Sequence, residues 1–139
     1  MIMKVLIMSV TAGNGHNSTA QAMIEEFEKN GIECHLLDTL EYINKHFCDA
    51  DLSISNVCCK YYISKSTAQR LFLKNIGISP KQYLLKLRME KAMFLLSEGD
   101  FLIKDIALQC GFKYEKYFSR IFQEKIGYLP SQLYKHHIN

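Results

Sequence analysis

Two hydrophobic patterns follow one another along the chain. Residues 4–10 form a β-branched and aliphatic run of strand length, and the glycine-rich residues 11–16 then predict a loop. A segment with apolar positions at helical spacing follows, and 32–37 predicts a second short strand. Residues 1–41 are therefore expected to form a βαβ-like leader.

From Thr39 onward the apolar positions recur at helical spacing, and we expect no further strand. Serine residues that suit N-caps, a proline that suits the first turn of a helix and glycines that suit helix ends mark the boundaries. The predicted helices are 39–48, 53–61, 65–75, 80–99, 103–110, 114–126 and 130–136. The fold class is mainly α after the leader.

An internal repeat organises these helices. Residues 70–82 and 120–132 share Arg, Phe, Ile, Gly, Pro and Gln at an offset of fifty, and an apolar frame upstream matches at an offset of forty-nine. Each copy consists of a short helix, a tight turn and a longer helix. This arrangement is that of a helix-turn-helix unit, whose second helix can lie in the major groove of DNA. The sequence therefore predicts two such units joined by the long helix at 80–99.

The longer helices carry polar side chains opposite their apolar faces. Leu71 and Phe72 are predicted core residues of the first, and Phe118, Ile121 and Phe122 of the second. Gln can bond adenine and Arg can bond guanine through two hydrogen bonds each. The outward residues, and hence the candidate DNA-binding residues, are Lys65, Ser66, Gln69, Arg70 and Lys74 in the first copy and Lys113, Glu115, Lys116, Tyr117 and Arg120 in the second. An ordinary polar surface on a helical bundle is the alternative.

Charge is distributed unevenly along the chain. Residues 1–45 hold three lysines and six acids, a net charge of −3, whereas residues 46–139 have a net charge of +6. A basic segment suits an anionic polymer, although a solvated basic face explains it equally well. The five cysteines have no metal-binding spacing and are expected to be reduced, mostly buried thiols. Without a membrane span or secretory signal in the sequence, we expect a cytoplasmic protein.

From about Tyr42 to Tyr134 the chain resembles the DNA-binding domain of the AraC/XylS family of transcription regulators. The resemblance holds in order and spacing over about ninety residues. It is carried by Ser64–Phe72, Gly77–Tyr83, Leu87–Ala92, Ile103–Ala107, Gly111–Phe112, Tyr117–Phe122 and Gly127–Pro130. It implies two helix-turn-helix units in successive major grooves of double-stranded DNA, with RNA polymerase as a further partner.

The same resemblance implies individual roles. It places base reading on Ser66, Gln69 and Arg70 and on Glu115, Lys116 and Tyr117, and gives Arg120 a phosphate or a base edge. Cys58 departs from the small Ala usual in the family, and the carboxylate of Glu115 departs from the usual Ser or Gln, which puts the target sequence in doubt. Because the leader is too short for a dimerising domain, we expect a monomer on an asymmetric site. No cofactor, metal or membrane is expected.

A second resemblance concerns residues 1–45. The segment 3–16, continued by 37–45, is similar to the opening of diacylglycerol glycosyltransferases related to monogalactosyldiacylglycerol synthase. There Gly13, Gly15 and His16 would belong to the acceptor-side domain; on pattern alone this loop is either a plain turn or an anion cradle. Such enzymes need several hundred residues, including a domain for the sugar nucleotide. We therefore expect no catalysis.

The sequence thus predicts a βαβ-like leader at 1–41 and a double helix-turn-helix domain at 42–139. The two resemblances meet within Glu41–His46, as in a join between two reading frames. The predicted function is sequence-specific regulation of transcription through DNA binding. One alternative is a non-catalytic glycosyltransferase fragment fused to a helical module, and another is a helical module that binds protein.

Overall fold

The computed structural model describes residues 34–136, and all regular structure in this range is helical. The helices are α3 (Cys34–His46), α4 (Ile54–Lys60), α5 (Lys65–Asn75), α6 (Pro80–Glu98), α7 (Ile103–Gln109), α8 (Glu115–Ile126) and α9 (Pro130–His136). The predictions of helices from residue 53 onward are confirmed within one or two residues at each end. None of the helices in this range is long and apolar enough to cross a membrane.

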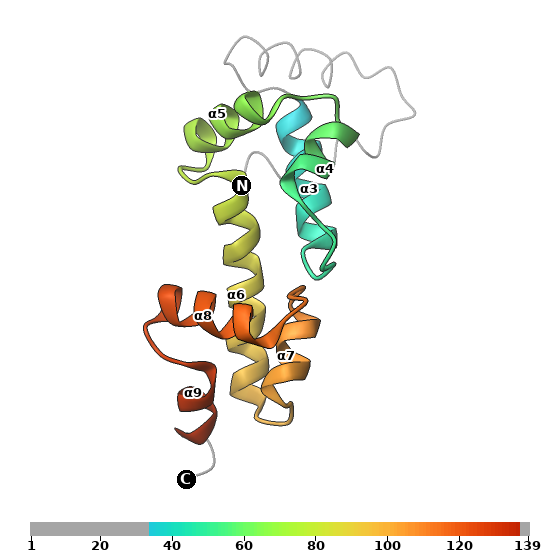
Figure 1. Ribbon diagram of the computed structural model, residues 1–139. Helices are drawn as coiled ribbons and strands as arrows, with labels where there is room; N and C mark the ends of the chain where they lie inside the picture. Colours follow the sequence, from blue (N-terminus) through green and yellow to red (C-terminus); the bar gives the residue numbers. More distant parts are fainter. Residues whose placement is uncertain (1–33, 137–139) are drawn as a thin grey trace, which may run out of the picture.

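Helix α6 is the axis of the molecule (Figure 1). Helices α3, α4 and α5 surround its first half, and α7, α8 and α9 surround its second half, with α8 crossing it. The two predicted helix-turn-helix units, α4–α5 and α7–α8, therefore lie at two levels along one helix.

Serine hydroxyls fix the starts of three helices. The Oγ atoms of Ser53, Ser64 and Ser79 accept hydrogen bonds from the backbone N–H three residues later, which satisfies donors that a helix leaves unpaired. At Ser79 the side chain of Gln82 also accepts from the serine N–H at 2.9 Å and completes a capping box. These three caps confirm the predicted helix starts.

Each half has its own hydrophobic core. The first core packs Ile43 of α3 and Val57 of α4 against Phe72 of α5. The second core contains Phe118 and Phe122 of α8, together with residues of α6, α7 and the turn between α7 and α8. Both predicted core pairs on the longer helices are confirmed, and Ile121 is half-buried at the edge of the second core. Because the clusters share no residue, the two units are packed separately on α6.

The prediction of a strand at 32–37 is wrong for residues 34–37, which form the first turn of α3. The apolar side chains of Leu36, Leu40, Ile43 and Phe47 are spaced three or four residues apart and pack into the first core. A helix directs Leu36, Leu40 and Ile43 to one side, and Phe47 just after its end packs on the same core, whereas a strand would point alternate side chains away from this core. Residues 1–33 of the predicted leader, including the loop with Gly13, Gly15 and His16, lie outside the described residues.

Candidate nucleic-acid interface

The two helix-turn-helix units have the same turn. In the first, the N–H of Ile63 donates to the carbonyl O of Cys58 at 3.1 Å; in the second, the N–H of Phe112 donates to that of Ala107 at 2.9 Å. The residue before each donor has a left-handed backbone, with φ of +54° at Tyr62 and +84° at Gly111. Donor, acceptor and left-handed residue all recur at the offset of forty-nine, so the sequence repeat is also a structural repeat.

Helix α5 presents the first group of predicted DNA-binding residues. Ser64 fixes its start, because its Oγ accepts from the N–H of Thr67 at 3.0 Å and donates to the Thr67 hydroxyl at 2.8 Å. Ala68, Leu71 and Phe72 bury the opposite face. The side chains left exposed include Lys65, Ser66, Gln69, Arg70 and Lys74. Two side chains that can each form a pair of hydrogen bonds with a base edge, the carboxamide of Gln69 and the guanidinium of Arg70, thus stand next to each other in sequence.

Helix α8 presents most of the second group. Phe118 and Phe122 are fully buried and orient the helix, and Glu115, Lys116, Tyr117 and Arg120 are exposed. The guanidinium of Arg120 lies over the Tyr117 ring, 5.4 Å from its centroid, which pre-organises both side chains. Glu115 in the first turn suits the positive end of the helix dipole.

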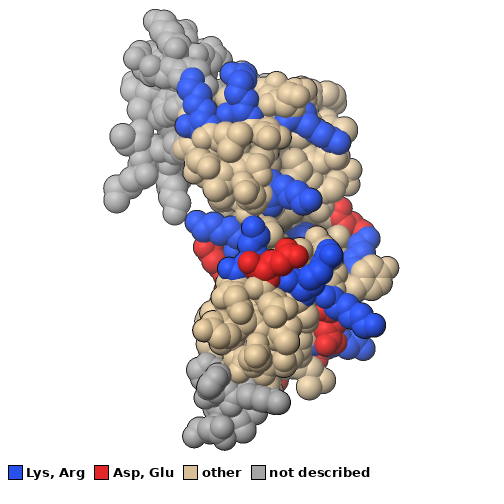
Figure 2. Space-filling model, turned by 60° about the vertical axis from the view of Figure 1, so that its left-hand side comes forward, with Lys and Arg blue, Asp and Glu red and all other residues tan. Residues whose placement is uncertain are grey.

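On the face shown in Figure 2, Lys and Arg side chains outweigh Asp and Glu side chains over the upper and middle parts. Lys and Arg side chains are spread over the upper and middle parts of the visible face and down its right side, while Asp and Glu form fewer, smaller patches near the middle. This distribution agrees with the net charge of +6 in residues 46–139. An anionic polymer can therefore be attracted to this basic surface.

Lys113 differs from the other predicted DNA-binding residues. It lies in the turn before α8, and its Nζ forms an ion pair with the carboxylate of Asp51, which follows α3. The hydrogen bond from Lys113 holds the pKa of the Asp51 carboxyl below its ordinary value, and the same bond raises the pKa of Lys113. Both groups remain exposed, but the charge of Lys113 is already partnered within the protein.

Sequence reasoning missed Arg88 as a residue that connects the two halves. From α6, its Nε donates to the carbonyl O of Phe47 at 2.8 Å and its Nη2 to that of Asp49 at 2.9 Å. Burial lowers its pKa from the ordinary value. The partners lie 41 and 39 residues away in sequence, so no local pattern could have indicated them.

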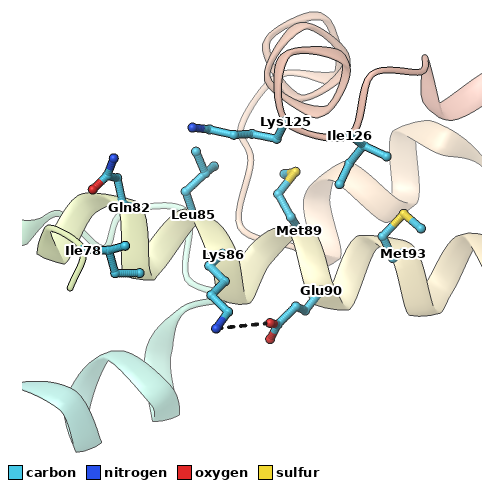
Figure 3. A pocket seen from close by; sticks show the side chains of 9 residues that line it. All are labelled: Ile78, Gln82, Leu85, Lys86, Met89, Glu90, Met93, Lys125 and Ile126. Atoms are coloured by element: carbon cyan, nitrogen blue, oxygen red, sulfur yellow. Dashed lines mark ion pairs between the residues drawn. The ribbon is translucent and has the colours of Figure 1, made fainter. Parts of the chain in front are cut away.

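A hollow of about 580 Å³ lies on the face of α6 beside the end of α8 (Figure 3). Its walls are mainly apolar, from Leu85, Met89 and Ile126, and Lys86 and Glu90 form an ion pair at 3.9 Å along its edge. In residues 34–136 no three His, Cys, Asp or Glu side chains come together as a metal site would require.

The repeated units, each with an exposed polar second helix, define a double helix-turn-helix protein. The family model described as a helix-turn-helix domain matches residues 57–136. The chain therefore belongs to this helix-turn-helix family, and its domain is the DNA-binding domain of AraC type.

Relatives and solved structures agree with this assignment. The chain is 33% identical over 98 residues to the HTH-type transcriptional activator RhaR of Cronobacter sakazakii, an alignment that covers 70% of this chain and 35% of RhaR. It is 29% identical over 112 residues to RhaS of Enterobacter sp., covering 81% of this chain and 39% of RhaS. The chain thus spans well under half the length of these relatives, which are transcription regulators and not enzymes.

Among solved structures, the C-terminal domain of AraT, a response regulator from Geobacillus stearothermophilus, has a TM-score of 0.70 and 32% identity, covering 75% of this chain and 86% of that one. The DNA-binding domain of AdpA, solved with a target DNA, has a TM-score of 0.64 at 20% identity, covering 73% and 91%. The second likeness shows a common fold. The predicted mainly helical double helix-turn-helix domain is confirmed.

Proposed function

We propose that this chain regulates transcription by binding one specific double-stranded DNA site, with α5 and α8 in successive major grooves on one face of the duplex. The observation that carries this proposal is the exact recurrence of the helix-turn-helix turn at Ile63 and Phe112, each followed by an exposed polar helix. In such units the second helix enters the major groove and reads base edges.

Individual contacts are assigned by position on the helices. On α5, Ser66, Gln69 and Arg70 would read bases, while Lys65 and Lys74 at the two ends of the helix would contact phosphates. On α8, base reading falls to Glu115, Lys116 and Tyr117, and Arg120 would hold a phosphate or a base edge. The ion pair between Lys113 and Asp51 leaves Lys113 the weakest contributor of the set.

Replacement of Arg70 by Ala tests the assignment. If Arg70 forms two hydrogen bonds with a guanine, Arg70→Ala weakens binding by about 1–3 kcal/mol and relaxes the sequence preference at one position. Affinities are measured on the selected site and on single-base variants of it. If the mutant keeps the parent's full sequence preference at every position, Arg70 does not read a base.

Lys74→Ala and Lys86→Ala form a matched pair. Loss of a phosphate contact at Lys74 weakens binding to all sequences alike and lowers the slope of log K against log salt by about 1. Lys86 points toward Glu90 on the hollow of α6 (Figure 3), so its replacement leaves the slope closer to that of the parent. If both substitutions lower the slope equally, Lys74 contributes only through the net charge of the protein and not through a phosphate contact.

We also propose the wider setting. The DNA-binding unit comprises 42–139, joined to the earlier residues through the continuous helix α3, and it acts as a monomer on an asymmetric site in the cytoplasm, with RNA polymerase as the regulated partner. Two unlike reading surfaces, Gln and Arg on α5 against Glu and Lys on α8, support an asymmetric site. The number of chains bound per selected duplex tests the monomer: one chain per duplex is expected. A dimer would bind two chains per duplex and protect a site about twice as long.

For residues 1–45 the likeness to the opening of a diacylglycerol glycosyltransferase stays a prediction, and we expect this segment to be non-catalytic. The measurement is incubation of the purified chain with sugar nucleotides and diacylglycerol. Release of a nucleoside diphosphate together with formation of glycosyldiacylglycerol would revive the alternative of a glycosyltransferase fragment.

A further inference from the structure

The turn between α3 and α4, residues 47–51, is held by side chains of the central helix α6 and of the second unit. Arg88 of α6 donates to the carbonyls of Phe47 and Asp49, as described above. Farther along α6, the Nζ of Lys91 lies 3.1 Å from the Sγ of Cys48. Lys113, in the turn before α8, pairs with Asp51. Three cations, two from α6 and one from the turn before α8, thus converge on this turn.

The backbone of the second unit also touches the 47–51 turn. A Cβ atom added to Gly111 would lie 2.7 Å from the carbonyl O of Phe47 and 3.1 Å from the carbonyl C of Cys48. Both distances are shorter than ordinary carbon contacts. The helix-turn-helix turn of the second unit therefore packs directly on the turn that closes α3.

These contacts connect the two recognition helices. On one side, Phe47 packs on the first core, to which α5 contributes Phe72. On the other side, the Arg88 guanidinium lies over the ring of Phe112, 5.5 Å from its centroid, and Phe112 packs on Phe118 of α8 with ring centroids 5.2 Å apart. Arg88 is thus the central member of a continuous packed route from α5 to α8.

On one side the two units do not meet directly. A groove of about 610 Å³ lies between them, lined by Leu52–Ser55 at the start of α4 and by Tyr117 and Ile121 on α8, with Arg88 on its wall. The hydrophobic cores share no residue. Because the groove leaves space on this side and the cores are separate, the angle between the units is set mainly by α6 and by the polar contacts of the 47–51 turn.

We propose that the 47–51 turn, held by Arg88, is a brace that sets the spacing between half-sites which the protein accepts on DNA. Arg88 is then a positioning residue for specificity and does not read a base. This inference rests on the proposed function, because it requires α5 and α8 to bind one duplex together. It concerns the distance between the two sequence blocks and not the bases within them.

The geometry of DNA makes spacing a sensitive readout. Insertion of one base pair moves a half-site by about 3.4 Å along the duplex and rotates it by about 35°. A rigidly braced protein loses the contacts of one half-site on such a duplex, and we expect at least a roughly tenfold loss of affinity for the parent. A protein whose units can pivot on α6 recovers part of those contacts.

The test compares Arg88→Met with the parent on duplexes that carry the selected site at its own spacing and with one base pair added or removed. Methionine keeps an apolar side chain in the groove but cannot donate to the carbonyls of Phe47 and Asp49. We expect weaker binding at the original spacing. The spacing penalty, the loss of affinity on adding or removing one base pair, should fall to about threefold or less, well below that of the parent. Lys86→Met, on the same helix but away from the brace, keeps the parent's penalty.

Asp51→Asn provides a second variant in case Arg88→Met does not fold, which circular dichroism would show. Asp51 is exposed, so its replacement leaves both cores intact, and we expect a partial reduction of the spacing penalty. If folded Arg88→Met or Asp51→Asn protein keeps the full spacing penalty of the parent, the brace is refuted, and the proposed function is unaffected. A parent that selects no two-block site overturns the proposed function, and the brace with it.

Discussion

Gly111→Ala tests the close packing between the two halves, and Gly77→Ala is its matched control. Both glycines follow a helix or its cap and both have φ of +84°. They differ in their surroundings: a Cβ at Gly77 meets nothing within 4 Å, whereas a Cβ at Gly111 lies 2.7 Å from the Phe47 carbonyl O and 3.0 Å from Arg88 Nε. The pair therefore separates the cost of backbone conformation from the cost of steric overlap.

The expected magnitudes follow from these two contributions. A left-handed backbone costs a residue with a Cβ roughly 1–2 kcal/mol relative to glycine, and this applies at both positions. Insertion of a methyl group into packed surroundings adds about 1–3 kcal/mol, and this applies at Gly111 alone. Loss of unfolded-chain entropy on replacing glycine is common to both and cancels in the comparison. We expect Gly77→Ala to destabilise by about 1–2 kcal/mol and Gly111→Ala by about 2–5 kcal/mol.

Urea unfolding followed by circular dichroism gives both free energies, with the slope of the transition as a check that each variant unfolds as the parent does. Each kcal/mol also corresponds to a shift in Tm of about 4–8 °C for a domain of 60–100 residues, which provides a second measurement. Equal destabilisation by the two substitutions, within about 0.5 kcal/mol, would refute the reasoning, since such a difference is no larger than that of ordinary surface changes. The second unit would then not rest on the 47–51 turn.

Three further predictions concern the cores, a cap and the thiols. Phe118→Ala empties a fully buried site and should cost about 3–5 kcal/mol in urea unfolding, against about 0.5 kcal/mol or less for Phe94→Ala, which is 61% exposed; similar costs for both would contradict the assignment of the second core. Ser79→Ala removes the capping box of α6 and should lower the unfolding free energy by about 1 kcal/mol, whereas no loss would show that Pro80 alone starts the helix. Burial raises the pKa of the Cys110 thiol to about 11, so the fold favours the protonated thiol, and this stability is present below pH 9 and lost as the pH rises toward 11. Cys110→Ala should therefore lose less stability than the parent between pH 9 and pH 11. Mass spectrometry at pH 8 should find alkylation of the exposed Cys59 long before that of Cys110. Simultaneous modification of both thiols would contradict the burial of Cys110.

The helices that bear the candidate site could be predicted because their signals are local. Ser53, Ser64 and Ser79 precede apolar faces at helical spacing, and a hydroxyl that caps a helix needs only the next three residues of its own chain. The repeat added a non-local check, since the same apolar frame twice predicts the same turn twice. The exposed residues of α5 and α8 followed from the buried positions Phe72 and Phe118.

The start of α3 was predicted wrongly, although a signal existed. Short apolar runs do not distinguish strand from helix, and the run that ends at Leu37 is short enough to suit either. The spacing of Leu36, Leu40, Ile43 and Phe47 runs through the expected boundary at residue 41 and indicates one helix. A window that crossed this boundary would have found it.

The connection between the units has no signal in a single sequence. Arg88 looks like any polar residue on a long helix, and its acceptors are backbone carbonyls, which every residue has. The pair between Asp51 and Lys113 joins residues from different units, so Lys113 could be recognised only as exposed and basic. Interactions of this kind depend on how separately formed helices pack, and only the folded structure shows them.

The measurement that tests the central claim most directly is selection of bound sequences from a random duplex pool by the full chain at about 0.15 M salt, where non-specific attraction is screened. We expect one enriched motif made of two unlike blocks about one helical turn apart, read by α5 and α8. Arg70→Ala should lose preference within one block only. Recovery of no motif, or of a single block that is unaffected by changes on α8, would contradict the claim that both helices read one site.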